Sequence, residues 1–117
     1  MACVHFFMKG AGVVTSFVQD KQLTVALSGE IDHHRAKKIM EHLAGKIEEF
    51  LPKVCILDFR EVTFMDSSGI AVVIHALRRV RELEGKLHLK NVPPQPYRVL
   101  HAAGIERVVT LEGRDEP

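Results

Sequence analysis

The sequence is poor in cysteine and in long apolar runs. Cys3 and Cys55 are the only cysteines among 117 residues, which is too few for a disulfide framework and favours a reducing cytoplasm. No apolar stretch approaches the roughly 18 residues that a membrane-spanning helix needs. The first residues lack the basic start and the long apolar segment of a secretory signal. We therefore expect a cytoplasmic protein that has no membrane partner.

The net charge is also small. The 16 Lys and Arg residues nearly balance the 15 Asp and Glu residues, so a net charge of +1 creates no long-range field for nucleic acid or a membrane surface. The two basic clusters, at residues 37–38 and 78–81, have acidic residues beside them and no ladder of aromatic side chains. These features argue against direct binding of nucleic acid.

The hydrophobic pattern predicts a single α/β domain. Apolar residues recur at helical spacing over residues 33–51, 70–85 and 97–102, with Asp32 as a candidate N-cap. Strand patterns cover residues 13–18, 23–27, 54–59, 86–90 and 105–111. Because helices alternate with strands after an opening hairpin, we expect a mixed, mostly parallel sheet with residues 54–59 in its middle.

The length fits one compact domain. Residues 1–11 are expected to form an N-terminal extension of uncertain structure. Residues 12–111 would form the domain, and residues 112–117 a charged tail.

The segment Asp66-Ser67-Ser68-Gly69 is the main candidate for function. It lies between a buried strand and the predicted start of an amphipathic helix. Unpaired N–H groups and the positive end of the helix dipole favour an anion at such a position. A phosphate on a serine here would leave the helix intact and add about two negative charges to the surface. The commoner interpretation is that Asp66 or a serine caps the helix.

The same segment does not match a nucleophile elbow. That motif needs Gly-x-Ser-x-Gly so that the backbone can make its strained turn. The residues two positions before Ser67 and Ser68 are Met65 and Asp66, so the small residue is missing in both registers. Nucleophilic catalysis is disfavoured.

The seven histidines do not predict a metal site. They are scattered over different elements, and the adjacent His33 and His34 would point about 100° apart on a helix. The tripeptide Asp32-His33-His34 also occurs in a phosphoesterase superfamily, but the further Asp and His ligands of those enzymes are not grouped here. We treat this match as accidental and expect no enzyme, no metal and no cofactor.

Two separated segments resemble the STAS family of anti-sigma factor antagonists. Residues 64–70 read Phe-Met-Asp-Ser-Ser-Gly-Ile after a central strand, as in that family. Residues 29–34 read Gly-Glu-Ile-Asp-His-His and resemble its sporulation branch. The resemblance covers about residues 12–111 and implies a single STAS-like domain.

The resemblance implies a mechanism of partner switching. The unphosphorylated domain would bind an anti-sigma factor that is also a serine kinase, and would thereby release a sporulation sigma factor. Phosphorylation of Ser67 by that kinase would end the binding, and a serine phosphatase would reverse it. The docking face would consist of Glu30, Asp32, His33, His34, Asp66, Ser67, Ser68 and Gly69.

A second hypothesis belongs to another class of function. A STAS-type domain can also bind a nucleotide or serve as a scaffold in a transport or stress assembly. Fold alone does not decide between the two. The match at His33 and His34 favours sigma-factor control.

Overall fold

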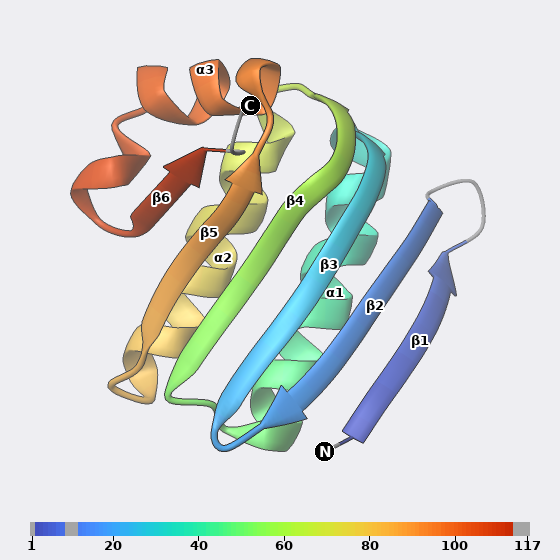
Figure 1. Cartoon of the computed structure of the whole chain (residues 1–117), viewed down its shortest axis with the longest axis vertical. Coiled ribbons are helices and arrows are strands. Elements are labelled where there is room, and N and C mark those ends of the chain that lie inside the picture. The colour runs from blue at the N-terminus through green and yellow to red at the C-terminus, as the bar shows by residue number, and fades with distance from the viewer. Residues whose placement is uncertain (1, 9–11, 114–117) are drawn as a thin grey trace.

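Six strands form one sheet, with helices between the later strands (Figure 1). The structure is a computed structural model that describes residues 2–8 and 12–113. The strands are β1 (Ala2–Met8), β2 (Gly12–Gln19), β3 (Gln22–Ile31), β4 (Val54–Met65), β5 (Lys86–Val92) and β6 (Thr110–Gly113). The helices are α1 (His33–Phe50), α2 (Ser68–Glu82), α3 (Pro94–Ala102) and the short 3-10 helix η1 (Ile105–Arg107).

The strands lie side by side in the order in which they follow along the chain. The pairs β1–β2 and β2–β3 are antiparallel, and the pairs β3–β4, β4–β5 and β5–β6 are parallel. The predicted α/β class is therefore confirmed, with its N-terminal hairpin and its mixed, mostly parallel sheet. β4 lies in the interior of the sheet, as its continuous apolar run predicts.

The core lies between the sheet and helices α1 and α2, which cover the same face of it (Figure 1). On β3 the side chains of Leu23, Val25 and Leu27 are buried, and the residues between them are partly exposed, as period-two alternation requires. α1 buries Ala36, Ile39, Leu43 and Ile47, and α2 buries Gly69, Val72, Val73, Ala76, Leu77 and Val80. Burial of each large aliphatic side chain stabilises the folded state by about 1.5–3 kcal/mol relative to its exposure.

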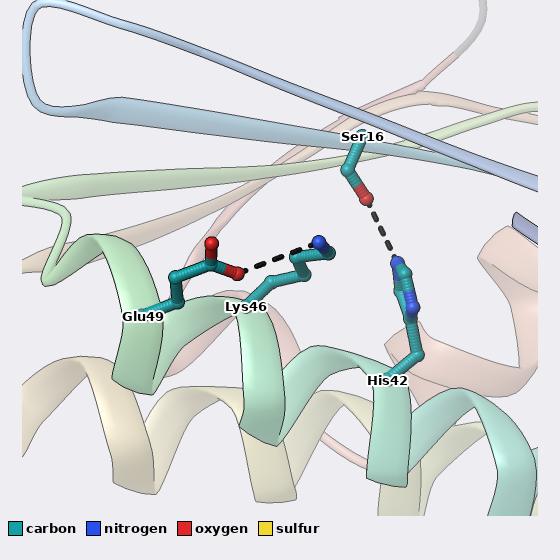
Figure 2. A network of polar contacts seen from close by, with 4 residues as sticks. All are labelled: Ser16, His42, Lys46 and Glu49. Carbon is teal, nitrogen blue, oxygen red and sulfur yellow. Dashed lines mark hydrogen bonds and ion pairs between the residues drawn. The ribbon is translucent and has the colours of Figure 1, made fainter. Parts of the chain in front are cut away.

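One polar contact between the sheet and the helices joins β2 to α1 (Figure 2). Ser16 is 1% exposed, and its Oγ lies 2.9 Å from Nε2 of His42. Burial, and then the nearby Lys46, lower the pKa of His42. Lys46 itself pairs with Glu49 at 3.5 Å along the same helix. Because Ser16 is enclosed, this serine–histidine pair satisfies a buried hydroxyl group and offers no accessible nucleophile.

The expectation of uncertain structure for residues 1–11 is wrong for residues 2–8. These residues form β1, which pairs antiparallel with β2 from Ala2–Val18 to Met8–Gly12. An edge strand is stabilised by its neighbour, which local sequence does not reveal. Residues 1 and 9–11 lie outside the described residues.

The strand predicted over residues 105–111 is also wrong in part. Residues Ile105–Arg107 form η1, and β6 begins only at Thr110. The N–H groups of Val108 and Val109 both donate to the carbonyl of Ile105, so local turn bonds replace strand pairing there. Of the predicted tail, residues 112 and 113 belong to β6, and residues 114–117 lie outside the described residues.

Two further boundaries bear on the site. β4 continues to Met65, beyond the predicted end at residue 59. α3 begins at Pro94, three residues before the predicted start at residue 97, because proline is tolerated in the first turn of a helix. Within the described part of the chain, no helix is both long and apolar enough to cross a membrane.

Candidate functional site

Parallel pairing of β3 and β4 brings the two candidate segments together at one edge of the sheet. Glu30 lies opposite Phe64, and Ile31 lies opposite Met65. Beyond the strands, the backbone N–H of Asp66 donates to the carbonyl of Ile31 at 3.1 Å. Residues 30–34 and 64–69, which 29 residues separate in the sequence, therefore come together on one side of the sheet.

The first part of this surface is the start of α1. Asp32 is its N-cap, and its Oδ1 accepts a hydrogen bond of 2.9 Å from the backbone N–H of Arg35. That hydrogen bond lowers the pKa of the Asp32 carboxyl, and the positive charge of Arg35 adds to the effect. Arg35 Nη1 donates to the carbonyl of Glu30 at 3.1 Å. His33 and His34 are exposed in the first turn.

The second part is the turn into α2. Asp66 Oδ1 accepts a hydrogen bond of 2.8 Å from the backbone N–H of Ser68. Ser67 occupies the N-cap position, yet its hydroxyl makes no capping hydrogen bond, and its side chain is exposed. The capping interpretation therefore applies to Asp66, because its carboxylate satisfies a free N–H group at the helix start. The Ser67 hydroxyl is left to solvent.

Gly69 has a packing role in this turn. A Cβ atom placed there would lie 2.2 Å from Sδ of Met65, whose side chain is fully buried. Any larger residue at this position would require the buried Met65 side chain to move. The docking role assigned to Gly69 from the sequence stays a prediction, and what the structure shows for this buried residue is its packing against Met65.

Sequence reasoning missed Gln95. Its Oε1 accepts a hydrogen bond of 2.9 Å from the N–H of Met65, and its Nε2 donates a hydrogen bond of 2.8 Å to the carbonyl of Met65. A glutamine between prolines carries no motif, and only the fold brings residues 65 and 95 together. The sequence feature that could have pointed to Gln95 is the rigid Pro-Pro-Gln-Pro segment that contains it.

Ser67 also lies at one end of an open groove along α2. The groove is lined by Met40, Ser67, Ile70, Ala71, Ile74, His75 and Arg78. No hydrogen-bond partner for the buried Nε2 of His75 occurs among the described residues. Burial, and then Arg79 and Arg78, lower the pKa of His75, which keeps this imidazole neutral near pH 7. Beside Ser67 the lining is therefore largely apolar, and it carries an unused hydrogen-bonding atom.

One large apolar side chain is exposed near the turn. Phe64 is 45% exposed, and it lies opposite the exposed Glu30 on the paired strands. Exposed aromatic residues are common anchors in protein interfaces. Phe64 therefore adds an exposed apolar side chain near the end of β4.

The site offers little for catalysis. None of the hydrogen bonds found in residues 2–8 and 12–113 joins a histidine to Ser67, so no general base is positioned on its hydroxyl. Nor do these described ranges contain a group of three or more His, Cys, Asp and Glu side chains that could hold a metal ion. The arrangement provides an exposed hydroxyl, a carboxylate beside it and an apolar surface, which suit recognition of another protein.

Comparison with known proteins identifies the family. The STAS domain family matches residues 14–114, so the chain belongs to it. The chain is 27% identical over 89 residues to the anti-sigma F factor antagonist of Paenibacillus polymyxa, and the match covers 76% of each chain. It is 26% identical over 98 residues to the anti-sigma-B factor antagonist of Bacillus subtilis, covering 83% of this chain and 87% of that protein.

Solved structures agree with this assignment. The anti-sigma factor antagonist SpoIIAA in its unphosphorylated form superimposes with a TM-score of 0.74 at 25% identity, covering 84% of this chain and 86% of that one. SpoIIAA in its phosphorylated form gives a TM-score of 0.67 over 84% of this chain and 89% of that one. The predicted STAS fold, with its likeness to SpoIIAA, is thus confirmed.

Proposed function

We propose that this protein is an anti-sigma factor antagonist that binds an anti-sigma factor with serine kinase activity and so releases a sporulation sigma factor. Phosphorylation of Ser67 ends the binding, and a serine phosphatase restores it. The docking face consists of Glu30, Asp32, His33, His34, Asp66, Ser67, Ser68 and Gly69, which lie at the carboxyl end of β3 and in the turns and helix starts that follow β3 and β4.

The observation that carries this proposal is the state of the Ser67 hydroxyl. It is exposed at the N-terminus of a 15-residue helix, and the neighbouring Asp66 performs the capping. A kinase can therefore reach the hydroxyl without unfolding the helix. The N-terminal end of the helix dipole also tolerates the resulting phosphate.

The surroundings of Ser67 explain how a phosphate ends docking. A phosphoserine carries about −1.5 to −2 charges, and it would stand between the Asp66 carboxylate and the apolar side chains of Ile70 and Ile74. A partner that covers this groove would have to desolvate the phosphate. Arg78, the basic residue in the groove's lining, stands eleven positions beyond Ser67, which is about 16 Å along the axis of α2. Such desolvation costs several kcal/mol, which exceeds the roughly 1.4 kcal/mol that weakens binding tenfold.

The relatives support the same proposal. Antagonists of anti-sigma F and of anti-sigma-B factors match most of this chain, and SpoIIAA exists in unphosphorylated and phosphorylated forms. The segment 29–34 favours the sporulation sigma factor. The match to the anti-sigma-B factor antagonist supports a second candidate, in which the partner is an anti-sigma-B factor.

The test uses purified anti-sigma factors of both kinds. The protein is mixed with each factor and Mg-ATP, phosphate is mapped by mass spectrometry, and binding is measured by calorimetry in ADP. We expect phosphate on Ser67, none in the Ser67→Ala variant, and unchanged phosphorylation in the matched Ser68→Ala variant. Ser67→Ala should retain binding, and Ser67→Asp should weaken it at least tenfold.

Each outcome separates the candidates. Phosphorylation only by the anti-sigma F factor supports the sporulation role, and phosphorylation only by the anti-sigma-B factor supports the second candidate. If neither factor binds or phosphorylates the protein while each acts on its own antagonist, the proposal is wrong. A titration with nucleotides would then test the nucleotide-binding alternative.

A further inference from the structure

We propose that Gln95 is a positioning residue that holds the end of β4 and thereby orders the turn that carries Ser67. Its effect on docking and phosphorylation rests on the proposed function of Ser67. The positioning itself is a property of the fold and can be measured without a partner.

The first observation is the pair of hydrogen bonds between one side chain and one backbone residue. The Gln95 amide accepts from the N–H of Met65 at 2.9 Å and donates to its carbonyl at 2.8 Å. Both contacts are partly buried, where an unsatisfied backbone group is costly. The side chain thus makes the same two bonds that a neighbouring strand would make.

The second observation explains why such a substitute is needed. β5 pairs with β4 only from Val54 to Asp58, whereas β3 remains paired with β4 as far as Met65. Successive residues of a strand direct their N–H and C=O groups to opposite sides. Asp66 donates its N–H to Ile31 of β3. The N–H and C=O groups of Met65 therefore point to the opposite side, where β5 no longer pairs with β4. Gln95 forms hydrogen bonds with both of these groups in place of β5.

The third observation is the rigidity of the segment that presents Gln95. Residues 93, 94 and 96 are all proline, so φ is fixed on both sides of the glutamine. Pro93 and Pro96 are buried, and Gln95 lies in the first turn of α3. Little backbone freedom is therefore lost when the two hydrogen bonds form.

Packing transmits this constraint to Ser67. The fully buried side chain of Met65 packs against Gly69 so closely that a Cβ atom at residue 69 would require it to move. Gly69 also donates its N–H to the carbonyl of Asp66 at 3.0 Å, which closes the turn around Ser67. A backbone shift at Met65 therefore displaces the first turn of α2. Gln95 limits that shift, and it keeps the acceptor turn in one conformation for its partner.

Amide hydrogen exchange followed by NMR tests the positioning. In Gln95→Met, which keeps the length and removes both hydrogen bonds, we expect exchange at the Met65 N–H to accelerate by about tenfold or more. The amide of Leu57, in the middle of β4, should change by a much smaller factor. The matched control is Gln22→Met, the same change at an exposed position at the opposite end of β3.

A second variant separates the two hydrogen bonds. Gln95→Glu retains an oxygen that accepts from the Met65 N–H, and it loses the donor to the Met65 carbonyl. Its Met65 amide should exchange more slowly than in Gln95→Met, and the Met65 carbonyl resonance should shift as it does in Gln95→Met. This combination identifies the two contacts individually, which a general loss of stability would not.

The proposal is overturned if Met65 exchange is unchanged in Gln95→Met, or if Met65 and Leu57 accelerate by the same factor. Binding to the anti-sigma factor is the functional measurement. We expect Gln95→Met to weaken it by about three- to tenfold through lost preorganisation, and Gln22→Met to leave it unchanged. Unchanged binding in Gln95→Met would overturn the functional part. If the wild-type protein binds no anti-sigma factor, the proposed function fails, and the exchange experiment still judges the positioning.

Discussion

The backbone N–H of Asp66 donates a hydrogen bond of 3.1 Å to the carbonyl of Ile31, and this contact joins the two halves of the candidate site. Ile31 is the last residue of β3, and Asp66 is the first residue after β4. The contact continues the parallel ladder by one step beyond β4. As a result, the start of α1 and the start of α2 meet on one surface, with Ser67 exposed upon it.

Substitutions at Ser67 should leave the fold intact. Its side chain is exposed and makes no capping hydrogen bond, so Ser67→Ala and Ser67→Asp should each change the free energy of unfolding by less than about 0.5 kcal/mol. Urea denaturation followed by circular dichroism measures this. A loss of more than about 1.5 kcal/mol in Ser67→Ala would mean that the hydroxyl supports the helix, which would weaken its assignment as a free acceptor.

Asp66 should behave differently from Ser67. Its carboxylate accepts from the Ser68 N–H at 2.8 Å, so Asp66→Ala should lower the free energy of unfolding by about 1 kcal/mol, the usual effect of a lost cap. Asp66→Asn keeps an accepting oxygen and should restore most of this loss. The same urea experiment compares the two variants, and equal stability of Asp66→Ala and wild type would contradict the capping role.

Gly69→Ala should destabilise the protein although alanine favours helices. The added Cβ would meet Met65 Sδ at 2.2 Å, and overpacking of this kind costs about 1–3 kcal/mol. In the double variant with Met65→Ala, the two changes should be strongly non-additive, because the clash then has no partner. Thermal denaturation of the four proteins in the cycle measures the coupling. Additive effects would show that the backbone relaxes without involving Met65.

Stability should fall as the pH drops below about 6.5, the ordinary pKa of histidine. Burial lowers the pKa of His42 and of His75, so between the folded and unfolded values the unfolded chain binds more protons. The free energy of unfolding therefore rises with pH in this window and is fully present above it. Urea unfolding at several pH values from about 5 to 8 tests this, and a double variant, His42→Gln with His75→Gln, should show a flatter dependence.

Cys55 should be unreactive in the folded protein. It is fully buried in β4, and burial raises the pKa of its thiol to about 12, so almost no thiolate exists at neutral pH. In a Cys3→Ser background, a thiol reagent should label Cys55 only in denaturant. Rapid labelling under native conditions would show that β4 opens more readily than its interior position suggests.

The sequence by itself determined the class of the fold and the location of the segment that leads into α2. Period-two alternation in β3 and the helical stripes of α1 and α2 are local patterns, because each reflects which face of one element meets the core. The run from Asp66 to Gly69, placed after a buried strand, likewise predicted the start of a helix. Asp32 likewise caps α1 as expected.

Only the tertiary structure decided how these segments cooperate. Choosing Asp66 over Ser67 as the cap required the positions of individual oxygen atoms, and both residue types are good caps in sequence. β1 and the contacts of Gln95 depend on partners that are distant or unremarkable in sequence. Hydrogen bonds between distant segments follow from the packing of the whole chain. Local periodicity therefore revealed the elements, and the fold alone revealed what holds Ser67 in place.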